Sequence, residues 1–320
     1  MSTTTNQKKM EKTIILASPR GFCAGVERAI KIVEAALEKF GQPVYVRHEI
    51  VHNKRVVNDL AAKGAVFVKE LDEIPPGYPV IFSAHGVAKA VHQTAEDLNM
   101  IAIDATCPLV TKVHIEASKH IRQGRHILLI GHAGHPEVIG TMGQVEASEI
   151  TLIETVEDAI AIQPPEDFDL AFATQTTLSA DETAEIITVL QHRFPEIRGP
   201  KGEDICYATT NRQNAVKAMA EDVDLCLVIG AQNSSNSKRL VETALQAGVN
   251  HAELIADANE LPFELIDNAA VIGLTAGASA PEILTDEVLA ALSERYQIVV
   301  TTQNFLTEKM QFKLPSMLTN

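Results

Sequence analysis

The fold is constrained most strongly by a pattern that recurs three times along the chain. In each copy, an apolar strand-like run ends in a polar loop, and a segment with helical periodicity follows. Three of these runs lead into "VHN", "GHAGHPE" and "NSSNS", and three others end in a cysteine, as in "MIAIDATC". Alternating strands and helices favour parallel sheets, whose ligand sites lie beyond the carboxyl ends of the strands. The sequence therefore predicts an α/β protein of three similar units with mostly parallel sheets.

The three units can be placed along the 320 residues of the chain. A polar leader comes first and is predicted to be disordered, and the N-terminal strand is expected to complete the third unit. The last segment has no helix pattern and is expected to pack on the core. The predicted parts are the leader 1–12, the N-terminal strand 13–23, the first unit 24–107, the second unit 108–206, the third unit 207–295 and the tail 296–320.

Charge and hydropathy narrow the class of protein. The net charge of −15 argues against non-specific binding to nucleic acid, which depends on clustered Lys and Arg side chains. No apolar run approaches the ~20 residues that span a bilayer. The polar leader also lacks the apolar core of a secretion signal. We therefore expect a cytoplasmic protein that binds neither nucleic acid nor membrane.

Three of the four cysteines occupy matching turns between a strand and a helix. They are Cys23, Cys107 and Cys206, one for each unit. If the units surround a common axis with pseudo-threefold symmetry, the three thiolates converge on one metal or cluster site. The helix N-termini behind them would lower the pKa of each thiol. A four-iron cluster normally takes four cysteines, so three would leave one iron open for a substrate. Thiolates also bind zinc, so the spacing alone does not separate the two metals.

The residues around these cysteines differ from those around the fourth. Gly21 and Gly25 lie close to Cys23, and a proline follows Cys107, so tight turns that aim the sulfur outward are expected. Cys226 lies between two leucines in "DLCLVIG". We predict that it is an ordinary buried residue of a strand.

Polar residues at the other strand ends indicate an anion pocket. Imidazole donates hydrogen bonds to phosphate, and so do short hydroxyl and amide side chains at a helix start. The candidates are His52, His85, His135, the run Asn233 to Ser237, and Ser279, with a routine helix cap as the alternative for the serine run. No Walker or dinucleotide motif is present. A compact phosphorylated or diphosphorylated molecule is therefore favoured over a nucleotide.

Glu137 is a candidate proton donor, because it follows His135 in the same loop. Burial and a neighbouring anion would raise the pKa of its carboxyl and suit it to general-acid catalysis. A threonine hydroxyl such as that of Thr176 could orient it. The plain alternative is a first-turn glutamate that stabilises a helix N-terminus.

Nine motifs in order now resemble those of the 4-hydroxy-3-methylbut-2-enyl diphosphate reductase family. They are "PRGFCAGVERAI", "VRHEIVHN", "FSAHGV", "DATCPLVTKVH", "GHAGHPEVIGTMGQ", "TQTTLS", "ICYATTNRQ", "NSSNS" and "TAGASAP". The resemblance implies reductive dehydroxylation of an allylic alcohol diphosphate to isopentenyl and dimethylallyl diphosphate, the last step of the non-mevalonate isoprenoid pathway. It also implies three α/β units around a central iron–sulfur cluster, in agreement with the repeat.

The same resemblance implies a role for each matching residue. Cys23, Cys107 and Cys206 would hold a [4Fe-4S] cluster, Glu137 would donate a proton, and Thr176 would hold the hydroxyl end of the substrate. The diphosphate would be bound by His52, His85, His135, Ser234, Ser235, Asn236 and Ser279. Thr177 and Thr209 are expected only to support these residues. Electrons would come from a small carrier such as ferredoxin or flavodoxin with its reductase.

Two other functions remain open on the residues alone. One is a zinc hydrolase in which Glu137 acts as the base. The other is a sensor that binds a phosphorylated metabolite and uses a cluster as a redox switch. Iron and sulfide content separates the first from a reductase, and turnover of the allylic diphosphate separates the second.

Overall fold

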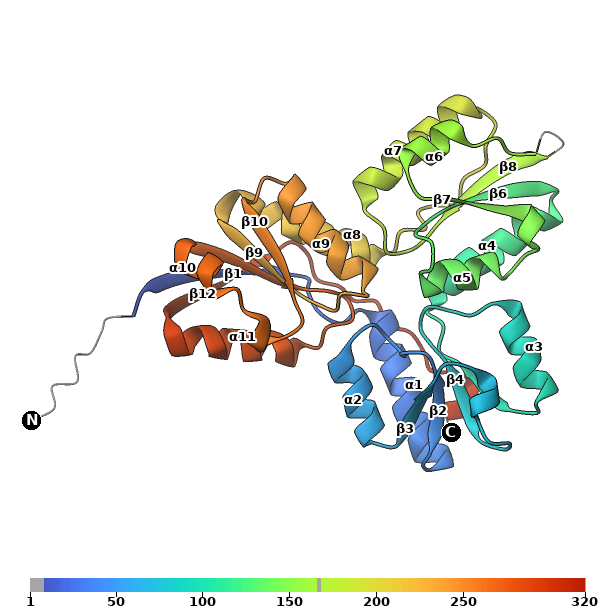
Figure 1. Ribbon diagram of the computed structural model, residues 1–320, viewed down its shortest axis with the longest axis horizontal. Coiled ribbons are helices and arrows are strands. Elements are labelled where there is room, and N and C mark those ends of the chain that lie inside the picture. The colour runs from blue at the N-terminus through green and yellow to red at the C-terminus, as the bar shows by residue number, and fades with distance from the viewer. Residues whose placement is uncertain (1–8, 166–167, 320) are drawn as a thin grey trace, which may run out of the picture. The chain divides into compact units, whose positions relative to one another are not determined.

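Strands with apolar residues on both faces lie at the centre of the sheets. The computed structural model describes residues 9–165 and 168–319 (Figure 1). Strands β4 (Pro79–Phe82), β6 (Arg125–Ile130) and β9 (Leu225–Ile229) are buried almost throughout. Such strands are typical of parallel sheets that helices cover on both sides. Every strand pair among the described residues is parallel, so the predicted α/β class with parallel sheets is confirmed.

The chain forms two compact units. The larger comprises residues 23–210 and 310–320, and the smaller comprises residues 1–22 and 211–309. Two of the three sheets of the described chain lie in the larger unit and one lies in the smaller. The division into three units, with the boundaries and the symmetry given above, stays a prediction.

The first sheet of the larger unit has the strand order β3-β2-β4-β5. Its elements are α1 (Ala24–Phe40), β2 (Val44–Arg47), α2 (Lys54–Ala62), β3 (Ala65–Val68), β4, α3 (Lys89–Asp97) and β5 (Ile101–Asp104). Helix α1 buries an apolar stripe that includes Ile32, Val33 and Ala36, as an amphipathic helix on a sheet does.

The second sheet of the larger unit has the order β7-β6-β8. Its elements are α4 (Pro108–Arg122), β6, α5 (Pro136–Met142), β7 (Ile150–Ile153), α6 (Val156–Ala161), β8 (Asp169–Thr174) and α7 (Ala180–Arg193). Side chains of α4 and α5 pack in one apolar cluster with this sheet, and those of α6 and α7 pack in another. Helices therefore cover both of its faces.

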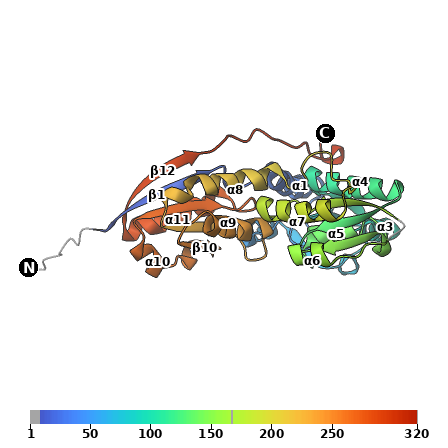
Figure 2. The ribbon, with the colours of Figure 1, turned by 90° about the horizontal axis from the view of Figure 1, so that it is seen from above.

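The smaller unit contains the sheet β10-β9-β11-β1-β12. Its elements are β1 (Glu11–Ser18), α8 (Tyr207–Met219), β9, α9 (Ser235–Gln246), β10 (His251–Ile255), α10 (Phe263–Asn268), β11 (Val271–Ala276), α11 (Glu282–Arg295) and β12 (Gln297–Asn304). One apolar cluster contains residues of α10 and α11 and the other contains residues of α8 and α9. Strand β12 runs beside β1 at one edge of the sheet (Figure 2).

The three sheets share one order of connection, which confirms the repeat. In each sheet the chain makes one strand, then its neighbour on one side, and then its neighbour on the other side. The direction of connection reverses between β2 and β4, between β6 and β8, and between β9 and β11. Such switch points leave a crevice beyond the carboxyl ends of the two strands, where ligands bind in α/β proteins.

The structure departs from the sequence expectations in three details. The cysteine turn at Cys206 follows a loop, because the only pairing described in that segment is an isolated bridge from Arg198 to Ala171 of β8. The N-terminal strand begins at Glu11, two residues inside the predicted leader, and residues 1–8 of that leader lie outside the described chain. Part of the tail is strand β12, whose backbone pairs with β1.

No helix in residues 9–165 and 168–319 combines the length and the apolar character that a bilayer crossing requires.

Candidate functional site

Three histidines meet in the larger unit, on loops that follow β2, β4 and β6. The rings of His52 and His85 stack with their centroids 4.1 Å apart. The ring of His135 stands edge-on to both, at 5.7 and 6.0 Å. His52 and His85 lie on the two sides of the switch point of the first sheet. The predicted grouping of these three residues is therefore confirmed by the geometry.

Burial keeps these imidazoles uncharged. It lowers the pKa of His52, and it lowers the pKa of His85 well below the ordinary value, with a further contribution from the two neighbouring rings. Burial and the ring of His52 lower the pKa of His135 to about 4. At neutral pH each ring is then uncharged. A bound anion would favour the charged form of each ring.

One hydrogen bond fixes the tautomer of His135. Its Nδ1 accepts from the backbone N–H of Glu137 at 3.2 Å, at the start of helix α5. In the neutral ring the proton then lies on Nε2, which is left as a donor. The neutral ring of His52 has the opposite tautomer, because its Nδ1 donates to the Oε2 of Glu49 at 3.2 Å and its Nε2 then carries no proton.

Glu137 is buried, with 2% of its surface exposed, at the first turn of α5. Its Oε1 accepts the backbone N–H of Thr176 at 2.6 Å, and its Oε2 accepts the Thr176 hydroxyl at 3.1 Å. Burial raises the pKa of Glu137 to about 7, although the two hydrogen bonds from Thr176 oppose the rise. The carbonyl of Thr176 in turn accepts the N–H of Cys206 at 3.0 Å. The partly protonated carboxyl of Glu137 is therefore linked through Thr176 to the turn that carries Cys206.

The three predicted cysteines all precede helices. Cys23 is the N-cap of α1, Cys107 is the N-cap of α4, and Cys206 comes directly before α8. The Sγ atoms of Cys107 and Cys23 lie 2.7 and 3.8 Å from the point where a Cβ on Gly25 would stand. Gly25 is therefore required for the close approach of a sulfur, whereas a tight turn was predicted as its reason. Cys206 interacts electrostatically with both other cysteines.

The expected lowering of the thiol pKa is wrong for Cys107 and Cys206. Burial raises the pKa of Cys107 to about 12, and the neighbouring cysteines add to the rise. Burial likewise raises the pKa of Cys206 to about 11. Backbone N–H groups of α4 and of Thr209 act in the expected direction, but their effect is smaller. A cation bound at these two thiols would favour their charged form.

Thr209 contacts the Cys206 sulfur twice. Its backbone N–H donates to the Cys206 Sγ at 3.4 Å, and its hydroxyl oxygen lies 3.2 Å from the same sulfur. Hydrogen bonds to a ligating sulfur are a common means of tuning iron–sulfur centres.

Among residues 9–165 and 168–319, no group of three His, Cys, Asp or Glu side chains is arranged to hold a single metal ion in this structure. Cys226 is fully buried in the core of the smaller unit, as predicted for an ordinary residue of a strand.

In the smaller unit, the serine run begins helix α9 directly after β9. Ser234 is the N-cap, and its Oγ accepts the backbone N–H of Ser237 at 3.3 Å. Ser235 and Asn236 are buried in the first turn. The cap that was considered as the plain alternative is therefore present, but it uses only Ser234.

Asn236 points to a ligand in its own right. Both polar atoms of its amide are buried, and neither has a hydrogen-bond partner. An unpaired buried amide is unfavourable by about 1–3 kcal/mol, so native proteins rarely keep one without a reason. Its Nδ2 lies 3.5 Å from a Cβ built on Gly277, in the loop after β11 that also carries the buried Ser279. These two loops flank the switch point of the smaller unit's sheet.

Two carboxylates were missed by the sequence reasoning. Asp204 is 5% exposed, accepts the backbone N–H of Thr174 at 3.1 Å and pairs with Lys112 at 3.2 Å. Asp104 accepts both the N–H and the hydroxyl of Thr106, at 2.8 and 2.5 Å. Asp204 precedes Cys206 by two residues and Asp104 precedes Cys107 by three, and this proximity to a cysteine was the available signal.

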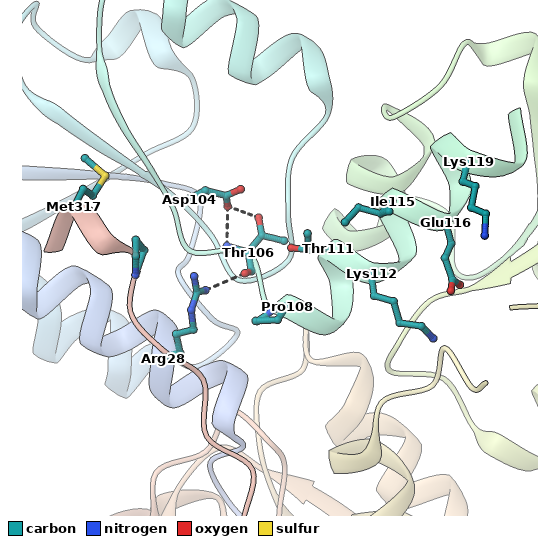
Figure 3. A pocket seen from close by; sticks show the side chains of 11 residues that line it. Arg28, Asp104, Thr106, Pro108, Thr111, Lys112, Ile115, Glu116, Lys119 and Met317 are labelled. Carbon is teal, nitrogen blue, oxygen red and sulfur yellow. Dashed lines mark hydrogen bonds between the residues drawn. The ribbon is translucent and has the colours of Figure 1, made fainter. Parts of the chain in front are cut away.

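A groove of about 790 Å³ opens beside the Cys107 turn (Figure 3). The residues on either side of the cysteine, Thr106 and Pro108, both line it. Arg28 of α1 reaches into the same groove and bonds the carbonyl of Thr106, and Met317 of the tail lies on its far side. None of the predicted substrate-binding residues lines this groove.

The chain is similar to known proteins along nearly its whole length. The profile of the LytB protein family matches residues 14–293. The 4-hydroxy-3-methylbut-2-enyl diphosphate reductase of Paracoccus denitrificans (strain Pd 1222) is 58% identical over 311 residues, which are 97% of this chain and 98% of that protein.

Two solved structures have the same fold. The E-1-hydroxy-2-methyl-but-2-enyl-4-diphosphate reductase of Plasmodium falciparum matches with a TM-score of 0.91 at 37% identity, over 97% of each chain. A structure described as (E)-4-hydroxy-3-methyl-but-2-enyl diphosphate reductase, the terminal enzyme of the non-mevalonate pathway, matches with a TM-score of 0.63 at 33% identity, over 88% of this chain and 99% of the other.

Proposed function

The chain belongs to the LytB protein family, and from that premise we propose that it is a 4-hydroxy-3-methylbut-2-enyl diphosphate reductase. The reaction removes the hydroxyl group of the allylic diphosphate and gives isopentenyl and dimethylallyl diphosphate. It consumes two electrons and two protons and releases one water. It is the last step of the non-mevalonate pathway to isoprenoids.

One observation supports the acid catalysis that this reaction requires. The buried carboxyl of Glu137, with a pKa of about 7, accepts hydrogen bonds from Thr176, and the carbonyl of Thr176 accepts the N–H of Cys206. A general acid works best when its pKa is close to the working pH. Glu137 is therefore assigned as the donor that protonates the departing oxygen, so that water leaves in place of hydroxide. The Thr176 hydroxyl orients the carboxyl and contacts the hydroxyl end of the substrate.

Cys23, Cys107 and Cys206 are assigned as the ligands of a [4Fe-4S] cluster. The close approach of two sulfurs over Gly25, the buried thiols and the Thr209 hydrogen bonds all support this assignment. When bound, such a cluster would pass single electrons and would offer one iron as a Lewis acid toward the substrate hydroxyl.

The histidines of the larger unit are assigned to the diphosphate. The ring centroids of His52, His85 and His135 lie within 6.0 Å of one another, and the Nε2 of His135 is free to donate to an anion. An anion among them would raise their pKa values, so its binding would take up protons. The second proton of the reaction comes from the substrate's own diphosphate, because no other acid was singled out from the sequence.

The serine and asparagine loops of the smaller unit are assigned to diphosphate binding as well. The residues are Ser234, Ser235, Asn236 and Ser279. The unpaired amide of Asn236 supports this role, since a phosphate oxygen would satisfy its Nδ2.

The source of electrons follows from the family resemblance. A small one-electron carrier, ferredoxin or flavodoxin with its reductase, is proposed as the donor. We also propose a location in the cytoplasm.

The function is tested on protein that is purified and assayed without oxygen. We expect about four irons and four sulfides per chain. We also expect consumption of (E)-4-hydroxy-3-methylbut-2-enyl diphosphate when dithionite and a viologen supply electrons. Zinc without sulfide would instead indicate the hydrolase. A bound cluster with diphosphate binding but no turnover would indicate the sensor.

A further inference from the structure

Arg28 joins three segments of the larger unit that are far apart in the sequence. It lies in helix α1, five residues after Cys23. Its Nη1 donates to the carbonyls of Ala105 and Thr106 at 3.3 and 3.0 Å, directly before Cys107. Its Nε donates to the carbonyl of Lys313 in the C-terminal tail at 2.9 Å. One guanidinium therefore connects the helix behind one cysteine with the turn that carries another.

Several other bonds hold the Cys107 turn. Backbone bonds run from the Cys107 N–H to the carbonyl of Ala84 at 2.9 Å and from the Ala105 N–H to that of Phe82 at 3.1 Å. On the side of the groove of about 790 Å³ (Figure 3), Asp104 accepts the N–H and the hydroxyl of Thr106, and Thr111 donates to the carbonyl of Cys107 at 3.3 Å. Arg28 is the lining side chain that bonds the carbonyls of Ala105 and Thr106. A change in Arg28 would therefore leave these two carbonyls without that donor and loosen the turn.

The positive charge of Arg28 gives it a second effect on the Cys107 turn. Burial lowers the pKa of Arg28, and the nearby charges of Asp104 and Cys107 oppose this, so the cation and the Cys107 sulfur interact. Guanidinium stays protonated in proteins. A fixed positive charge favours the more negative state of a neighbouring redox centre, because reduction adds an electron there.

We propose that Arg28 is a positioning residue for the three-cysteine site. Its guanidinium fork fixes the Cys107 turn against helix α1 and the C-terminal tail, and its charge raises the reduction potential of the centre that the cysteines hold. This inference rests on the proposed function only in that the centre is an iron–sulfur cluster. It predicts that charge and geometry can be separated by substitution.

The test compares three variants of the full chain, prepared without oxygen. Arg28→Gln removes the charge and the fork, and Arg28→Lys keeps the charge but loses the planar fork. Lys39→Gln is the matched control, because Lys39 is on the same helix and bonds the same tail, at the carbonyl of Met317 (2.6 Å), without touching the Cys107 turn. The readouts are the midpoint potential from a titration followed by electron paramagnetic resonance, and the rate of iron release in air.

Arg28→Gln is expected to shift the one-electron reduction equilibrium roughly tenfold toward the oxidised form, which corresponds to about 59 mV for one electron. It should also release iron roughly tenfold faster. Arg28→Lys should keep the wild-type potential and still release iron faster. Lys39→Gln should match the wild type in both measurements.

Several results would overturn the inference. They are a wild-type potential in Arg28→Gln, wild-type iron release in Arg28→Lys, or equal effects of Arg28→Gln and Lys39→Gln. The Arg28→Lys measurement decides the question even if Arg28→Gln does not fold. A wild-type chain that holds no iron and sulfide would instead refute the proposed function, so the two failures are distinguishable.

Discussion

Replacing Glu137 by Gln removes the proposed proton donor while the size of the side chain is kept. The structure sets the scale of the effect. Burial raises the pKa of Glu137 from 4.5 to about 7, which is a change of about 3 kcal/mol in the free energy of ionisation. At pH 7 about half of the carboxyls are protonated, compared with on the order of 1 in 300 for an ordinary glutamate. The buried environment therefore supplies about two orders of magnitude in the population of the acid.

We expect Glu137→Gln to reduce turnover roughly 10²-fold or more, the usual scale for loss of a general acid. Iron, sulfide and affinity for the diphosphate should stay at wild-type values, because the amide has nearly the same shape. The assay is consumption of the allylic diphosphate with dithionite and a viologen, so that no carrier protein limits the rate. Turnover within about threefold of the wild type would remove Glu137 from the chemistry.

The pH dependence gives a second check, with a definite sign. An acid that must be protonated is active below its pKa, so the wild-type kcat/KM should fall about tenfold per pH unit above pH 7. Thr176→Val removes the hydroxyl that stabilises the carboxylate, and the backbone N–H bond remains. The pKa of Glu137 should then rise and the alkaline fall should move to higher pH. Thr188→Val, an exposed threonine of α7, is the control and should not move it. A profile without any alkaline fall up to about pH 9 would contradict the raised pKa.

Three further substitutions test the other parts of the site. Cys107→Ser should abolish iron and sulfide binding by the anaerobically purified protein, whereas Cys226→Ala in the core should retain both; equal metal content in the two would contradict the ligand assignment. Gly25→Ala places a Cβ 2.7 Å from the Cys107 sulfur, so iron content should fall and stability should drop by about 1–3 kcal/mol. Unchanged iron content would show that the sulfur can move aside. Asn236→Ala should weaken binding of inorganic diphosphate roughly tenfold, with no loss of thermal stability, because the amide is unpaired in the ligand-free chain. A lower melting temperature would indicate a structural role for that amide instead.

Much of the architecture was accessible from local patterns. Apolar runs such as "HILLI" and "LCLVI" became buried parallel strands, since a strand with helices on both sides needs apolar residues throughout. The polar loops that recur in the sequence lie at the switch points of the sheets. This follows from the repeat, because each copy connects its strands in the same order and each loop leaves the carboxyl end of a strand. A strand was expected before Cys206 because the other two cysteines of the repeat follow strands, although "EDIC" itself contains two acidic residues, which are uncommon in strands.

The parts that escaped prediction depend on contacts between distant segments. Arg28 contacts residues 77 and 285 positions away, and no periodicity in the sequence reports such a bond. The clash that makes Gly25 necessary involves a sulfur from another helix, so the sequence indicated only a turn. The direction of the pKa shift was predicted wrongly for the thiols of Cys107 and Cys206. The sequence shows that a helix begins after each of them, but it does not show how deeply each sulfur is buried.

The switch points explain why donors of different kinds occupy equivalent places. The loop after the first strand of each repeat carries His52, the His135 and Glu137 pair, or the serine run, and the loop after the third strand carries His85, Thr176 or Ser279. In each sheet these two loops flank one crevice, so a substitution in either loop changes the chemistry without altering the strands that support it. The three copies thus have the same order of strands but different polar residues, with two imidazoles in the first, an imidazole, a carboxyl and a hydroxyl in the second, and amide and serine donors in the third. The cysteines lie in neither of these two loops. They come after the remaining segment of each repeat, so they are separated along the chain from the loops at the switch points in all three copies.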